Sequence, residues 1–136
     1  MSRWFADTFY FLALINPKDA RHEAAVQFSR GHGRSVVTTA WVLSELADGL
    51  SKRATRGTFG LLYEGLVADP ATKIISASDD LWERGRLLYA ARPDKDWSLT
   101  DCISFVVMER EKIAEALTGD HHFEQAGFLA LLKPPP

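Results

Sequence analysis

The stretch Ser35–Thr39 reads SVVTT, and it leads directly into Ala40–Leu50, which reads AWVLSELADGL. Residues Ser35–Thr38 form a short segment rich in β-branched residues, a composition that favours a strand. Thr39 can cap the segment that follows, whose apolar residues recur at helical spacing. A buried strand that runs into a capped helix is the building unit of an α/β fold.

The same unit repeats on both sides of this stretch. Further strands are predicted at Trp4–Ala6, Lys73–Ile75, Glu115–Thr118 and Phe128–Leu132. Helices are predicted at Thr8–Ile15, Ala20–Arg30, Phe59–Val67, from a Ser78 cap through Ala91, at Leu99–Lys112, and in a short segment that begins at Asp120. The strands lack polar alternation, as expected where helices cover both faces of a sheet. The pattern predicts an α/β fold with a mainly parallel sheet.

Length and composition restrict the class of protein. The 136 residues suit one domain, spanning 1–136, and 46% of them are apolar. The formal net charge of −2 lacks the basic excess of a tight phosphate binder, although it does not exclude an enzyme that holds phosphate through a metal ion. Cys102 is the single cysteine, so no internal disulfide can form. No stretch approaches the ~20 apolar residues of a membrane span, and we expect a soluble cytoplasmic protein without membrane contact.

Four acidic residues occupy positions where an α/β sheet binds ligands. Asp7 follows the first predicted strand, and Asp120 follows the fourth. Asp101 lies in the first turn of the long helix. Glu45 lies about 60° from Val42 on a helical wheel, so it borders the apolar stripe and is not expected to face open water. Parallel sheets bind ligands beyond the carboxyl ends of their strands, where these acids are expected to meet.

Carboxylates that converge in one cleft raise each other's pKa unless a cation neutralises them. Mg²⁺ or Mn²⁺ suits such oxygen ligands. Either ion can polarise a phosphodiester, lower the pKa of a bound water and stabilise the leaving oxygen. No side chain stands out as a nucleophile, and this chemistry needs none.

Each acid also has a structural interpretation. Ser98 and Asp101 match a capping box, and Asp120 is a suitable N-cap for a short helix. Asp7 can cap the first helix in the same way, and Glu45 can be a solvated helix residue. The combined placement of the four after neighbouring strands favours the functional interpretation over the structural one.

Four motifs in this order resemble the PIN-domain family over Trp4–Leu132. The first two are Ala6-Asp7-Thr8 after the opening strand and Ser44-Glu45-Leu46 inside the helix that follows the second strand. The third is Leu99-Thr100-Asp101-Cys102 at the start of the long helix. The fourth is Ala116-Leu117-Thr118-Gly119-Asp120-His121-His122-Phe123 near the end of the chain. The resemblance implies a three-layer α/β/α sandwich and Mg²⁺- or Mn²⁺-dependent cleavage of RNA. Many relatives are VapC-type toxins of type II toxin–antitoxin pairs, usually homodimers that a small antitoxin protein inhibits.

The resemblance also implies roles for individual residues. Asp7, Glu45 and Asp101 would be the principal metal ligands or activators, with the metal on Asp7 and Asp101. Asp120 would assist them in catalysis. Thr8 and Thr118 would support these acids by hydrogen bonds.

This sequence departs from the family pattern at His122, where many relatives carry a further acid, and this puts a second metal ion in doubt. His121 and His122 point about 100° apart on a helix and lack a metal-ligand spacing. We expect a surface position for both, and contact of one of them with a phosphate is the alternative. Asp96, in a polar loop, either contributes to the site or is a solvated turn residue, and we expect the latter.

Other functions are compatible with a doubly wound sheet. A haloacid-dehalogenase-like phosphatase would need a second Asp two residues after Asp7, where Phe9 stands. A receiver domain would need a phosphoacceptor Asp after a middle strand, but Ile75 leads only to Ser76-Ala77-Ser78. A housekeeping RNA-processing nuclease and a catalytically silent interaction domain of the same fold remain as alternatives.

Overall fold

The computed structural model describes residues 3–31 and 33–134. Its middle layer is a sheet of five strands, β1 (Arg3–Ala6), β2 (Ser35–Thr39), β3 (Thr72–Ile75), β4 (Glu115–Leu117) and β5 (Leu129–Ala130). The strand order is β3-β2-β1-β4-β5, and every neighbouring pair is parallel. The prediction of a parallel sheet is confirmed.

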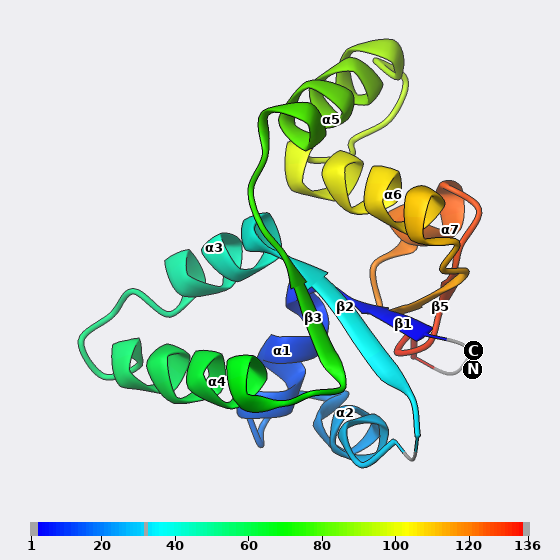
Figure 1. Cartoon of the computed structure of the whole chain (residues 1–136). Coiled ribbons are helices and arrows are strands. Elements are labelled where there is room, and N and C mark those ends of the chain that lie inside the picture. The colour runs from blue at the N-terminus through cyan, green and yellow to red at the C-terminus, as the bar shows by residue number, and fades with distance from the viewer. Residues whose placement is uncertain (1–2, 32, 135–136) are drawn as a thin grey trace.

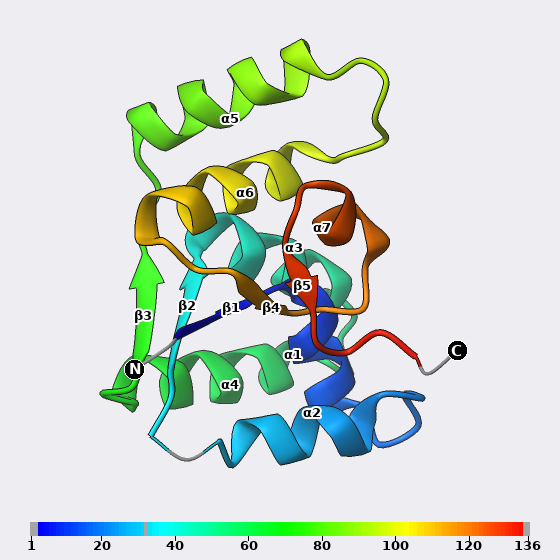
Figure 2. The same ribbon diagram turned by 90° about the vertical axis from the view of Figure 1, so that its right-hand side faces the viewer.

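Helices cover both faces of this sheet (Figures 1 and 2). They are α1 (Thr8–Ile15), α2 (His22–Ser29), α3 (Ala40–Gly49), α4 (Arg56–Ala68), α5 (Asp79–Ala91), α6 (Leu99–Glu111) and α7 (His121–Gln125). In Figure 2, α5 and α6 lie in the upper part of the molecule, and α1, α2 and α4 lie in its lower part. This arrangement is the expected three-layer α/β/α sandwich.

Local sequence signals explain where several helices begin. The Thr39 hydroxyl accepts a hydrogen bond from the Val42 amide (3.1 Å) at the start of α3. The Ser78 hydroxyl accepts one from the Leu81 amide (3.2 Å) at the start of α5. These caps satisfy amide groups that a helix leaves unpaired in its first turn. The predicted stripe of α3 is buried, with Val42, Leu43 and Leu46 facing the core.

Two elements differ most from the sequence-based expectation. Helix α4 begins at Arg56, three residues earlier than predicted, although Gly57 and Gly60 have low helix propensity. Its residues Phe59, Leu62 and Leu66 pack against the core, and this packing outweighs the propensity cost. Strand β5 covers only Leu129–Ala130, shorter than the predicted Phe128–Leu132.

The core lies between the sheet and its helices. Its largest fully buried side chains include Phe5, Phe11, Leu46, Ile103, Met108 and Phe123. Cys102 is buried there as expected, and burial raises the pKa of its thiol to about 11. No helix in the described part of the chain is long and apolar enough to cross a membrane.

The order of the strands places the site. From the central β1 the chain builds β2 and β3 on one side, and then returns to build β4 and β5 on the other. Ligands of such sheets bind where the direction of building reverses, here at the carboxyl ends of β1 and β4. Ala6 pairs with Leu117 in register. The residues that follow, Asp7 and Thr118, therefore emerge side by side.

Candidate active site

Asp7 lies at the centre of this edge of the sheet. Its residue is only 5% exposed, and its Oδ2 accepts a hydrogen bond from the Thr118 hydroxyl (2.8 Å). Asp7 occupies the N-cap position of α1, but its side chain makes no capping bond. The structural interpretation of Asp7 as a side-chain cap of α1 is therefore wrong.

Thr118 connects Asp7 with the end of β4. Its hydroxyl donates to Asp7 and accepts a hydrogen bond from the Asp120 amide (3.1 Å). The Asp120 carboxylate in turn accepts from the His122 amide (2.9 Å) and caps α7. The expected capping role of Asp120 is confirmed, and this run of hydrogen bonds fixes its position relative to Asp7.

Asp101 enters the site from the first turn of α6. Its Oδ2 accepts a hydrogen bond from the Ser98 amide (3.2 Å), and its own amide donates to the Ser98 hydroxyl (3.0 Å). The predicted capping box is confirmed. Asp101 is only 8% exposed and lines the same cleft as Asp7, so one residue both caps the helix and contributes to the site.

Glu45 reaches the site from α3. Its Oε1 accepts a hydrogen bond from the Thr8 hydroxyl at the start of α1. The expectation that Glu45 would not face open water is wrong, because the residue is exposed. Its long side chain leaves the apolar stripe of α3 and extends across to α1, where Thr8 holds the carboxylate at the mouth of the cleft.

These side chains surround one cleft of about 520 Å³. It is lined by Asp7, Thr8, Phe9, Glu45, Asp96, Ser98, Asp101, Asp120 and His122. All four acids predicted as catalytic are therefore brought together, together with Thr8. Thr118 is fully buried and is hydrogen-bonded to Asp7 and Asp120. Asp96 is an exposed loop residue, as expected, at the rim.

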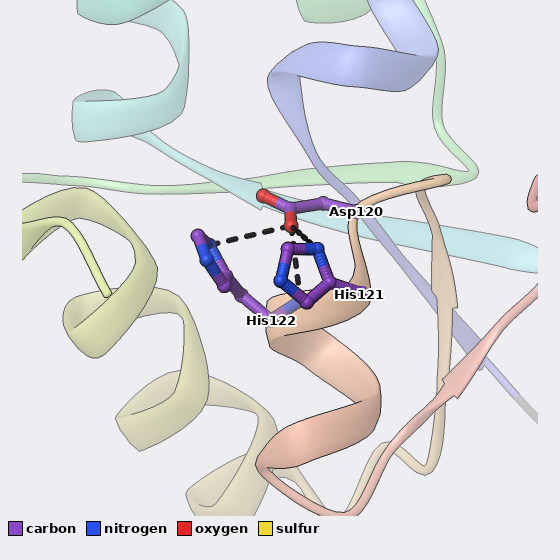
Figure 3. Close-up of side chains that lie close together, drawn as sticks. All are labelled: Asp120, His121 and His122. Atoms are coloured by element: carbon purple, nitrogen blue, oxygen red, sulfur yellow. Dashed lines mark hydrogen bonds and ion pairs between the residues drawn. The ribbon is translucent and has the colours of Figure 1, made fainter. Parts of the chain in front are cut away.

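His122 was misplaced by the sequence-based expectation. Figure 3 shows the imidazoles of His121 and His122 next to each other beside the Asp120 carboxylate. The His121 side chain is 71% exposed, as predicted, but that of His122 is only 19% exposed. His122 Nδ1 lies 3.3 Å from both Asp101 Oδ2 and Asp120 Oδ1. The cap at Asp120 and the burial of Phe123 turn His122 towards α6.

Phe9 is the second residue of the cleft that sequence reasoning did not find. Its ring lies against Gly119, where an added Cβ would come within 2.5 Å of Phe9 Cζ. The glycine directly before the last acid was a usable signal, because glycine permits close approach of another group to the backbone.

Burial is the largest influence on the charges of this site. It raises the pKa of Asp7 to about 7; the Thr118 hydrogen bond opposes the rise, and the Asp101 and Glu45 carboxylates add to it. Burial also raises the pKa of Asp101, with a contribution from Asp120 and opposition from the Ser98 amide and His122. The predicted rise is confirmed for Asp7 and Asp101, although removal from water contributes more than mutual repulsion.

Residues 5–129 match the family described as the PIN domain. The chain belongs to the PIN domain family. It is 27% identical over 125 residues to the 23S rRNA-specific endonuclease VapC20 of Mycobacterium tuberculosis, and the alignment covers 92% of this chain and 95% of that protein. The resemblance inferred from the four acidic motifs is thereby confirmed.

Solved structures agree with this membership of the PIN domain family. The crystal structure of M. tuberculosis VapC20, a sarcin-ricin loop cleaving toxin, superposes with a TM-score of 0.82 at 26% identity and covers 94% of this chain and 97% of that one. Two further solved structures share the fold. VapBC2 of Rickettsia felis bound to promoter DNA has a TM-score of 0.67 at 15% identity and covers 94% of this chain and 96% of that one. FitAcB of Neisseria gonorrhoeae has a TM-score of 0.60 at 16% identity and covers 93% of this chain and 94% of that one.

Proposed function

We propose that this PIN domain is a metal-dependent endoribonuclease that hydrolyses RNA phosphodiester bonds, and that it is the toxin of a type II toxin–antitoxin pair. The observation that carries the proposal is the convergence of Asp7, Glu45, Asp101 and Asp120 in one cleft at the carboxyl edge of the sheet. The similarity to VapC20 over nearly the full length of both chains supports it.

The residues of the cleft fit a divalent cation. Asp7 and Asp101 are buried carboxylates, and burial raises the pKa of each. Neither is paired with a Lys or Arg among the described residues. Such an oxygen donor set suits Mg²⁺ or Mn²⁺, and we assign Asp7 and Asp101 as the principal ligands.

Each residue then has a role in hydrolysis. When bound, the ion polarises the phosphodiester and lowers the pKa of the attacking water. Glu45, held by Thr8 at the mouth of the cleft, accepts the proton that the water loses as its oxygen bonds to phosphorus. Asp120 assists in holding the charge of the site, and Thr118 keeps Asp7 and Asp120 in their relative positions. The leaving ribose oxygen takes a proton from solvent.

The relatives also suggest substrate and partners. VapC20 is described as acting on 23S rRNA, and we propose a structured cellular RNA, in the cytoplasm, as the substrate of this chain. Structural neighbours include VapBC assemblies, and we propose a small antitoxin partner and a homodimer. The exposed apolar side chains of α4 and α5, which include Leu61, Val67, Trp82 and Tyr89, offer surface for such contacts.

A cleavage assay with purified protein tests the proposed activity. Total RNA containing 23S rRNA should be cut at discrete positions in the presence of Mn²⁺ or Mg²⁺, and EDTA should stop the reaction. Intact RNA under all metal conditions would contradict the activity and favour a silent interaction domain.

Expression in cells tests the toxin role separately. The wild-type chain produced alone should arrest growth, and the Asp7→Asn variant should not. Cells that tolerate an active wild-type enzyme would favour the housekeeping nuclease.

A further inference from the structure

The Nδ1 atom of the His122 imidazole lies inside the acidic cleft and has no hydrogen-bond partner among the described residues. This atom is also shielded from solvent. Buried polar atoms of this kind are uncommon, because an unpaired donor or acceptor loses its water without compensation. The arrangement therefore leaves one ring nitrogen available to a ligand that the cleft takes up.

Two carboxylate oxygens face the same nitrogen. Asp101 Oδ2 and Asp120 Oδ1 each lie 3.3 Å from His122 Nδ1. Both oxygens are already oriented by a backbone amide, that of Ser98 for Asp101 and that of His122 itself for Asp120. Each oxygen keeps a further lone pair. Backbone amides thus orient the oxygens of Asp101 and Asp120, and His122 presents its Nδ1 to both from α7.

Each of these two spacings matches a pair of ligands of one cation. Protein ligands lie about 2.0–2.2 Å from Mg²⁺ or a first-row transition metal, so two ligands of one ion are roughly 3.0–3.4 Å apart in octahedral or tetrahedral geometry. The contacts of 3.3 Å from His122 Nδ1 fall in this range.

We propose that His122 binds the cleft cation through Nδ1, beside Asp101 and Asp120, and that this nitrogen ligand makes the site prefer Mn²⁺ to Mg²⁺. Imidazole suits transition metals, whereas Mg²⁺ selects oxygen ligands and keeps most of its water. This inference rests on the proposed metal dependence and adds a ligand and a metal preference to it.

His121 is the natural alternative, because its ligand atom also lies within 4.8 Å of those of Asp120 and His122. Its side chain is 71% exposed, however, and its Nδ1 is 3.6 Å from Asp120 Oδ1. An exposed imidazole keeps its rotamer freedom and hydrogen bonds to water, so holding a metal costs it side-chain entropy. The neighbouring histidine is therefore a matched control.

Electron paramagnetic resonance on the purified full-length chain with Mn²⁺ alone tests this assignment without RNA. The electron spin echo of bound Mn²⁺ should be modulated by a ¹⁴N nucleus in the wild type and in His121→Asn. The modulation should disappear in His122→Asn, which places an amide oxygen near the position of Nδ1. The Kd for Mn²⁺ should rise about tenfold or more in that variant.

A second variant tests the metal preference. His122→Asp supplies an oxygen ligand, so the ratio of the Mg²⁺ and Mn²⁺ dissociation constants should fall by about tenfold relative to the wild type. This variant and the wild-type spectrum decide the question even if His122→Asn fails to fold.

The outcomes separate this inference from the proposed function. A wild-type spectrum without ¹⁴N modulation, or modulation lost only in His121→Asn, would overturn the ligand assignment even if the enzyme cleaves RNA. An unchanged ratio of dissociation constants in His122→Asp would overturn the preference. Modulation in a chain that cleaves no RNA would support the ligand and contradict the proposed ribonuclease.

Discussion

At the residue scale, the buried carboxylate of Asp7 sets the energetics of the site. Its neighbours are Thr118, which donates a hydrogen bond to it, and the carboxylates of Asp101 and Glu45. A carboxylate that is removed from water without a positive partner destabilises the fold when it ionises. The metal-free protein therefore stores a cost at Asp7 that a bound cation would relieve.

Replacing Asp7 by Asn should stabilise the metal-free protein at high pH. The pKa of Asp7 is raised from 3.8 to about 7, so the folded protein holds this proton more tightly than the unfolded chain. Protonation of Asp7 therefore contributes to the stability of the wild-type fold below pH 4. This contribution to the free energy of unfolding is lost as the pH rises to 7. Urea unfolding in EDTA should give Asp7→Asn an advantage of up to about 4 kcal/mol at pH 8, which vanishes near pH 4.

Asp94→Asn is the matched control for this experiment. Asp94 is an exposed acid bound to Arg92 outside the cleft, and its replacement should give no gain at pH 8. An Asp7→Asn variant that is less stable than the wild type at pH 8 would contradict the assigned burial cost.

Thr118 should matter through its hydroxyl alone. Thr118→Val removes the donor to Asp7 and the acceptor for the Asp120 amide, so we expect a stability loss of about 1–3 kcal/mol and a 10–100-fold lower cleavage rate. Thr118→Ser keeps both hydrogen bonds and should retain most activity. Equal rates for the Val and Ser variants would show that the hydroxyl does not position the acids.

At the element scale, the start of α6 is both a helix end and a wall of the cleft. Ser98 caps the helix and its amide orients Asp101, whereas Ser78 caps α5 by the same kind of bond away from the cleft. Comparing substitutions at Ser98 and Ser78 therefore distinguishes the effect of a helix cap on stability from its effect on the active site.

Ser98→Ala and Ser78→Ala should each lower the free energy of unfolding by about 1 kcal/mol, since each removes an N-cap acceptor. Only Ser98→Ala should also slow RNA cleavage, because it loosens the first turn that carries Asp101. Chemical denaturation and initial cleavage rates measure the two effects. Activity reduced equally in both variants would indicate a general effect of instability.

Elements and their order were predictable from local signals. Thr39, Ser78 and Ser98 mark helix starts in the sequence, and the short apolar strands mark the sheet. The start of α4 at Arg56 was missed because Gly57 has low helix propensity, while packing of the helix against the core supports the longer helix. Local patterns do not contain such tertiary contacts.

The candidate site was predictable for residues that directly follow a strand, because neighbouring parallel strands bring such residues close together. Asp7 and Asp120 follow neighbouring strands, so parallel pairing brings them together. The orientation of His122 was missed because it depends on how α7 packs against α6, a contact between segments rather than a local pattern. The exposure of Glu45 was missed because a wheel angle does not fix the reach of a long side chain.

At the scale of the whole molecule, the sheet order gathers residues from α1, α3, α6 and α7 into one cleft. A ligand of this cleft should therefore stabilise the complete fold. We expect Mn²⁺ at about 100 times its Kd to raise the Tm by roughly 5–10 °C, with full reversal by EDTA. Asp101→Asn should lose most of this shift, and a shift of wild-type size in that variant would place the ion elsewhere.

The most direct test of the central claim compares RNA cleavage by Asp7→Asn and Asp94→Asn in the presence of Mn²⁺. Both substitutions remove one carboxylate charge, but only Asp7 lies in the cleft. If the acidic cleft performs hydrolysis, the Asp7→Asn rate should fall by about 100-fold or more, while Asp94→Asn cleaves at the wild-type rate. A folded Asp7→Asn variant that cleaves as fast as the wild type would contradict the assignment of the active site.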